Sequence, residues 1–284
     1  MHNNYEDGND YRLGLTFSRT FSLVRSALSV VLQNAKRVRE DGGKRLTNND
    51  LKKNTNLGSI YIESMPRYGY GVGLLDQNHL PTMLGDYALI YDSLLEQVGT
   101  QWIMHYHLSA PHGPGPSFWN MLIINRFYHS SIFTREDIFE QIGEFVWKNT
   151  NSIPAKRSID NPTTAFLGTY TKIDGLSKLR LLETTSTGRF QVRDPSPAPI
   201  WVVGYALIDY WQSQYPGRIT IGLDTLHDSE FMKLFMLGKA DLETILLALQ
   251  EAKYIEFHRS VQPYQIVLLR QDSQPLLKRL YGED

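Results

Sequence analysis

The chain has 284 residues, of which 42% are hydrophobic and 21% charged, and its formal net charge is -1. A net charge this small excludes attraction of the whole molecule to nucleic acid or to an anionic membrane, so such binding requires a local patch. The absence of cysteine excludes disulfides, thiolate zinc sites and cysteine nucleophiles, and it favours a cytoplasmic location. The polar start and the lack of a run of ~20 apolar residues predict neither a signal peptide nor a membrane span.

The apolar pattern predicts a mainly α-helical fold with small β-wings. We expect four segments, which are a flexible tail (1–12), an N-terminal winged helix-turn-helix domain (13–95), a helical middle domain (96–215) and a C-terminal winged-helix-like domain (216–284). In the last domain, a helix followed by two alternating strands is typical of the end of a winged module.

A helix-turn-helix is expected over residues 45–75. Thr47 is placed to cap a short helix, with Asp50 as its capping-box partner. A second helix is expected to begin at Ser59 and to bend or end early at Pro66, because proline removes one backbone hydrogen bond. The following residues, 74–84, are interpreted as a β-wing.

Basic residues gather beside this motif. Between residues 36 and 53 there are seven Lys or Arg and three acids, an excess of four positive charges. Such a rim contacts DNA phosphates and positions a protein on the duplex, so we expect double-stranded DNA as a partner. The candidate DNA-binding residues are Lys36, Arg37, Arg39, Lys44, Arg45, Lys52, Lys53, Ser59, Tyr61 and Arg67.

Two alternatives stay open for this region. The charge cluster also fits a solvated helix end and loop. The second helix is poor in side chains that contact DNA, and Glu63 would repel phosphate, so the helix also fits a role in holding proteins together.

Two further stretches of the middle region bear on its structure. A helix is expected to begin at residues 160–164, where Asp, Asn, Pro and Thr precede an apolar run. Residues 181–199 are the least regular, and they fit either a Pro-rich connector or a ligand-facing strand that carries Arg189 and Arg193.

No catalytic motif is recognisable, so we expect a protein that is not an enzyme and needs no cofactor or metal. The glycines after Asp41 and Tyr68 have the wrong spacing for phosphate or dinucleotide binding. His105, His107 and His112 are the nearest approach to a metal set, but helical residues two apart point in different directions, and packed or surface histidines explain them better. A metal-dependent nuclease or modification enzyme using these histidines is a further hypothesis.

Several blocks, in their order along the chain, resemble the bacterial family registered as domain of unknown function 4007. They are NLGSIYIESMPRYGYGVGLL, PTMLGDYAL, GTQWIMHYHL, INRFYHSSIFTREDI, DNPTTAFLGTY and YALIDYW. One departure is that residues 58–61 lack the lysine of the Gly-Lys-Asn type start found in the family, so the resemblance does not imply phosphate contact by that helix start. It does imply a gene context beside phage-defence and DNA-modification systems, including BREX and DNA phosphorothioation systems, and it implies no catalytic residues.

Together these observations predict a non-catalytic, DNA-binding accessory subunit of a bacterial phage-defence or DNA-modification complex. The alternative is a protein-binding scaffold subunit of the same complex without direct DNA contact. In that alternative, aromatic surfaces hold the partner subunits, and the residues expected to form them are Trp102, Trp119, Tyr205 and Trp211.

Overall fold

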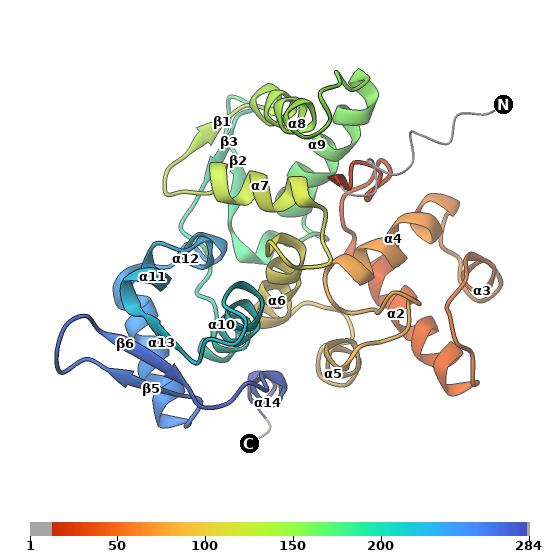
Figure 1. The fold of residues 1–284 in the computed structure, drawn as a ribbon. Coiled ribbons are helices and arrows are strands. Elements are labelled where there is room, and N and C mark those ends of the chain that lie inside the picture. Colours follow the sequence, from red (N-terminus) through yellow and green to blue (C-terminus); the bar gives the residue numbers. More distant parts are fainter. Residues whose placement is uncertain (1–12, 283–284) are drawn as a thin grey trace. The chain divides into compact units, whose positions relative to one another are not determined.

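The computed structural model describes residues 13–282, so the expected flexible tail, 1–12, lies outside the described residues. The fold is mainly helical with small antiparallel sheets, as predicted (Figure 1). The chain divides into two compact units, the first ending at Ser196 and the second beginning at Pro197. The expected boundaries at 95/96 and 215/216 do not coincide with this division, and separate folding of those segments stays a prediction.

Four helices of the first unit pack together, and the first three of them, with the loop between the first and the second, carry the candidate DNA-binding residues. Among these, α2 packs against α3, α4 and α5, and α3 packs against α4. The apolar residues of α2 form one buried stripe, since Leu28, Val31, Leu32 and Ala35 are fully buried. The bounds are α2 (Arg25–Glu40), α3 (Asn48–Asn54), α4 (Ser59–Gly71) and α5 (Met83–Tyr91).

The predicted start of α3 is confirmed as a capping box. The Thr47 hydroxyl accepts from the Asp50 amide at 3.2 Å, and the Asp50 carboxylate accepts from the Thr47 amide at 2.8 Å. The hydroxyl of Thr47 also donates to this carboxylate. These bonds hold the pKa of Asp50 below its ordinary value, so the carboxylate stays charged. The amide group at the start of the helix therefore keeps its hydrogen-bond acceptor.

Replacing Thr47 with alanine is expected to destabilise the first unit by about 1 kcal/mol, because the first turn of α3 loses its cap. Thermal unfolding should detect a fall in melting temperature of about 2–4 °C. A matched control is Thr244→Ala, at an exposed position inside the helix Lys239–Glu251, where the hydroxyl donates to the Ala240 carbonyl. Equal losses in the two variants would contradict a capping role for Thr47.

The expected β-wing over residues 74–84 is not formed as a pair of strands. The described chain makes a single isolated bridge there, between Leu75 and Pro81. The Asp76 carboxylate accepts from the amides of Asn78 and Leu80 at 2.8 and 2.9 Å, which closes the loop into a tight turn. Since α5 already begins at Met83, too few residues remain for a ladder.

Pro66 neither ends nor divides α4, which runs through it to Gly71. Similarly, α9 begins at Lys156, earlier than expected, and runs through Pro162. The helix α9 is amphipathic across this proline, with Ile159, Ala165 and Phe166 buried. Burial of that face offsets the backbone bond that the proline removes, so the apolar pattern outweighs the proline as a guide to helix ends.

The middle region, expected to be helical, also contains a three-stranded antiparallel sheet in the order β1-β3-β2. Its strands are two or three residues long, too short to show an alternating pattern in the sequence. Thr184 pairs with Phe190, and Phe190 stacks on Phe133 with ring centroids 6.1 Å apart. The elements are α6 (Val98–Ser109), α7 (Ser117–Arg126), β1 (Ile132–Phe133), α8 (Arg135–Thr150), α9 (Lys156–Thr171), η1 (Ser177–Leu179), β2 (Leu182–Thr184) and β3 (Phe190–Val192).

The second unit has a similar plan. Its sheet is also antiparallel, in the order β4-β6-β5, and the predicted helix and hairpin are confirmed as α13, β5 and β6. Helix α10 packs against α13 and α14, and α13 against β5. The elements are α10 (Ile200–Gln214), β4 (Thr220–Gly222), α11 (Leu223–His227), α12 (Glu230–Leu234), α13 (Lys239–Glu251), β5 (Ile255–His258), β6 (Gln265–Leu268) and α14 (Gln274–Leu280).

One order of elements therefore occurs twice. In the first unit a helix, α7, leads to a short strand, then to α8 and α9, and then to the β2–β3 hairpin. In the second unit α10 leads to β4, α11 to α13, and the β5–β6 hairpin. In both sheets the last strand lies between the other two. No helix in the part of the chain that the structure describes is long and apolar enough to span a membrane.

Candidate nucleic-acid interface

The predicted basic rim is formed by the end of α2, the loop after it and α3 (Figure 1). The α2–α4 and α2–α3 contacts hold these three segments together. Five of the seven predicted cations are exposed at this rim, which we call the basic face. They are Arg37, Lys44, Arg45, Lys52 and Lys53.

Within residues 13–282, no ion pair joins a side chain of the basic face to a carboxylate. The nearby carboxylate of Asp50 is held in the capping box. Lys36, which was also predicted, lies 3.9 Å from Glu40 on the next turn of α2, with both side chains largely in water. An exposed pair of this kind contributes little energy and exchanges readily for a phosphate contact.

Arg39 has a structural role that its sequence neighbourhood did not reveal. Its guanidinium donates to both carboxylate oxygens of Asp86 on α5, one of them at 3.0 Å, and to the Pro81 carbonyl at 3.0 Å. The hydrogen bond to Asp86 raises the pKa of Arg39. These paired hydrogen bonds join α2 to the start of α5. Asp86 lies 47 residues after Arg39, so no local sequence pattern indicated the pairing.

The candidate residues on α4 differ in what they contact. Ser59 is exposed at the first turn. Tyr61 packs edge-on against Phe21, with ring centroids 5.5 Å apart, and Arg67 donates to the Thr16 carbonyl at 2.8 Å. A third contact, between Arg19 and Glu63 at 3.5 Å, completes the cover that residues 16–21 place over this side of α4. The middle of α4 is therefore partly covered by protein, whereas both residues that open its first turn, Ser59 and Ile60, are exposed.

The aromatic residues expected to form a partner surface are in the core instead. Trp102, Trp119 and Trp211 are almost completely buried, and Tyr205 is buried as well. The Trp102 indole donates to the Ser196 carbonyl at 3.0 Å, and the Trp211 indole to the Arg218 carbonyl at 2.6 Å. Large aromatic side chains are enriched in cores as well as in interfaces, so their presence in the sequence did not decide between the two.

The three histidines are engaged with aromatic side chains or backbone. His105 is fully buried, and its Nδ1 lies 2.8 Å from the Tyr170 hydroxyl. His107 packs on Gly73, where an added Cβ would meet the ring at 2.6 Å, and His112 Nε2 lies 3.3 Å from the Tyr106 hydroxyl. Among the residues that the structure describes, no group of three His, Asp or Glu side chains is placed to hold a metal ion.

Comparison with known proteins places the fold. The model of the family described as Protein of unknown function (DUF4007) matches residues 36–281. No curated protein matches the sequence. Two solved structures are similar, one of SspB with a magnesium ion bound (TM-score 0.76, 15% identity) and one of SspB (TM-score 0.75, 16% identity). Each alignment covers 94% of this chain and 87% of the SspB chain, and at this identity the likeness concerns the fold.

Magnesium is bound in the first of those SspB structures, which raises the question of a similar site here. Magnesium binds through carboxylate and other oxygen ligands. The described residues bring no three metal-ligating side chains together, and the histidines are occupied as above. We assign no metal chemistry to this chain.

Proposed function

Because this chain belongs to the family described as Protein of unknown function (DUF4007), its role has to be argued from its own residues, and we propose that it is a non-catalytic subunit that binds double-stranded DNA. The observation that carries this proposal is the basic face, five exposed cations gathered on α2, α3 and the loop between them. Unpaired Lys and Arg side chains on one face are what phosphate contact requires.

In this proposal the predicted residues divide into two groups. The basic face, Lys36 and Ser59 contact the DNA backbone. Arg39, Tyr61 and Arg67 position the surface, through Asp86, Phe21 and Thr16 respectively. Since residues 16–21 cover the middle of α4 and Glu63 there carries a negative charge, contact with base edges is limited, and binding depends little on sequence.

The repeated order of elements supports a winged-helix interpretation. Residues 117–192 and 200–268 each contain a helix, a strand, two or three helices and a hairpin, with the last strand in the middle of the sheet, and a winged helix has this order of elements. We propose that α2, α3 and α4 form a third, N-terminal module of this type with a reduced wing. Tandem modules of this kind serve either DNA or protein binding, so the charge on each decides its role.

The N-terminal and C-terminal modules differ in the charge of their helices. In the second unit, α13 occupies the place of the DNA-reading helix and carries Asp241, Glu243 and Glu251 against the single base Lys239. A helix with this excess of carboxylates repels phosphate. We therefore assign DNA contact to the N-terminal module and not to the C-terminal one.

The context that we propose is a phage-defence or DNA-modification complex. It rests on the gene neighbourhood implied by the family, to which residues 36–281 belong. A DNA-binding accessory subunit suits such a complex because it brings the other subunits to the duplex. Because the DNA of a bacterium lies in the cytoplasm, we propose that the protein is located there.

Fluorescence anisotropy with a generic labelled duplex, over a salt series, tests the proposal. If the five cations of the basic face each neutralise one phosphate, the slope of log K against log salt is about -4.5. Affinity then falls several hundredfold between about 50 and 200 mM salt. A flat salt dependence, or no binding at the lowest salt, would contradict a phosphate-contacting surface.

The alternative, a scaffold without DNA contact, has lost the four aromatic residues that first supported it, since these are buried. It retains other exposed apolar side chains, among them Trp147 and Ile153. Stable co-purification with a neighbouring gene product and no salt-sensitive DNA binding would favour this alternative.

A further inference from the structure

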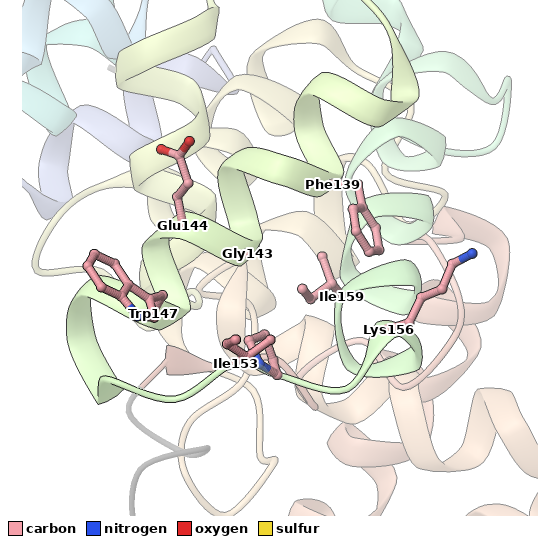
Figure 2. A pocket seen from close by; sticks show the side chains of 8 residues that line it. Phe139, Gly143, Glu144, Trp147, Ile153, Lys156 and Ile159 are labelled. Carbon is pink, nitrogen blue, oxygen red and sulfur yellow. The ribbon is translucent and has the colours of Figure 1, made fainter.

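A groove with mostly apolar walls lies between α8 and the start of α9. Its volume is about 490 Å³. In Figure 2 the apolar side chains lie along one side of α8 and the loop after it, with Glu144 and Lys156 on opposite sides of them. The lining residues are Phe139, Gly143, Glu144, Trp147, Ile153, Pro154, Lys156 and Ile159.

Two of these side chains are unusually exposed for their type. Trp147 is 53% exposed and Ile153 is 89% exposed. Phe139 is half-buried beside them. Single exposed apolar residues are common, but a tryptophan and an isoleucine beside an apolar groove form the kind of patch that marks an interaction site.

The backbone fixes both side chains in place. Asn151 ends α8 in the left-handed conformation, φ 53°, and its amide donates to the Trp147 carbonyl at 2.8 Å. Residues 152–155 then return the chain to α9, with Pro154 in the groove wall. A tryptophan on a helix and an isoleucine on a short, turn-anchored loop lose little entropy on binding, so the groove is largely preorganised.

The first turn of α9 gives this groove a positively charged edge. Lys156 and Arg157 are both exposed, and neither forms an ion pair within the described part of the chain. A second cavity, of about 470 Å³, lies on the other side of the same turn and is lined by Arg157, Ser158, Arg19 and Thr16 among others. Cations lie on both sides of this turn. A ligand that covers the groove is therefore complementary in charge if it carries a carboxylate at this end.

We propose that this groove binds a segment of a partner protein that has an apolar anchor residue and, beside it, an acidic residue. The anchor packs on Trp147, Ile153 and Phe139, and the carboxylate reaches Lys156. A nucleic acid fits less well, because Glu144 would repel phosphate. The groove lies outside the basic face, so this proposal is independent of the proposed DNA binding.

Selection of random peptides displayed on phage, with the whole chain as bait, tests this. We expect enrichment of peptides in which a Leu, Phe or Trp is followed or preceded within a few residues by Asp or Glu. Labelled versions of these peptides are then titrated by anisotropy. Trp147→Ala is expected to weaken binding at least tenfold, and Lys156→Glu to weaken it about as much.

Tyr128→Ala is the matched control, because Tyr128 is 59% exposed in the same unit and lies outside the groove. It should leave the peptide affinity unchanged, as should neutralisation of the basic face. The proposal is overturned if no motif is enriched, if selected peptides bind Trp147→Ala as tightly as the original protein, or if a single-stranded oligonucleotide competes for the groove and selected peptides do not.

Discussion

Replacement of Lys44, Lys52 and Lys53 by alanine is expected to lower the affinity for duplex DNA about a hundredfold at ~0.15 M salt. Each lost phosphate contact reduces the slope of log K against log salt by roughly 0.9, so the slope should become shallower by about 2.7. All three side chains are exposed, and none forms an ion pair in the described part of the chain. The loss should therefore appear in binding and leave the fold intact, which anisotropy and thermal unfolding measure together.

The control for this variant has the same change in net charge at a different place. Lys233, Lys239 and Lys253 are exposed residues of the second unit, and their triple replacement by alanine should change the DNA affinity much less. Equal losses in the two triple variants would mean that only the overall charge matters. No loss in the first variant would remove the basic face from the proposal.

Replacement of Tyr170 by phenylalanine is expected to destabilise the first unit by about 2–4 kcal/mol, although it removes a single oxygen. The Trp119 indole donates to the Tyr170 hydroxyl at 2.9 Å, and His105 Nδ1 lies 2.8 Å from the same oxygen. The hydroxyl accepts from Trp119, and its bond to His105 runs in the direction that the imidazole tautomer sets. All three residues are almost fully buried, so both partners lose a hydrogen bond in a place that water does not reach.

The ring and hydroxyl of Tyr170 are also shielded from water. Burial raises the pKa of Tyr170 well above that of a free tyrosine. The rings of Trp119, Phe127 and Phe166 surround it, with centroids 6.1, 5.3 and 5.4 Å from its own. A phenylalanine keeps these ring contacts, so the loss measures the hydrogen bonds and not a cavity.

Urea unfolding combined with amide hydrogen exchange separates this effect from changes elsewhere. Protection should fall in α6 and α9 and stay unchanged in α10 and α13, which belong to the second unit. The exposed residue Tyr128 supplies the control, since Tyr128→Phe should cost less than about 0.5 kcal/mol. A Tyr170→Phe protein as stable as this control would show that the bonds to Trp119 and His105 contribute little.

The predictions from the sequence that proved correct concern features whose interacting residues lie within a few positions of one another. The capping box at Thr47 joins a hydroxyl and a carboxylate three residues apart. The stripe on α2 and the α13 helix with its hairpin follow from the same short-range periodicity. Each of these patterns carries its own hydrogen bonds or its own buried face, so neighbouring residues suffice to identify it.

Other predictions failed where the partner lies far along the chain. The sheet of the middle region joins Phe133 to Phe190, and its strands are too short to be recognised before they pair. Buried Arg25 shows the same limit, because it donates to the carbonyls of Leu95, Ile173 and Gly175, and nothing near it in the sequence indicates this role.

By itself the sequence determined the helical class, the positions of α3 and α4 and the local excess of positive charge beside them, because these depend on residues close together in the chain. The tertiary structure decided which of those charges are exposed. It paired Arg39 with Asp86, covered Arg67 with Thr16 and buried Trp102 and Trp119, while it left Trp147 at the surface. Exposure depends on which segments pack together, and only the folded chain brings residues that are 50 or more positions apart, such as Thr16 and Arg67, into contact.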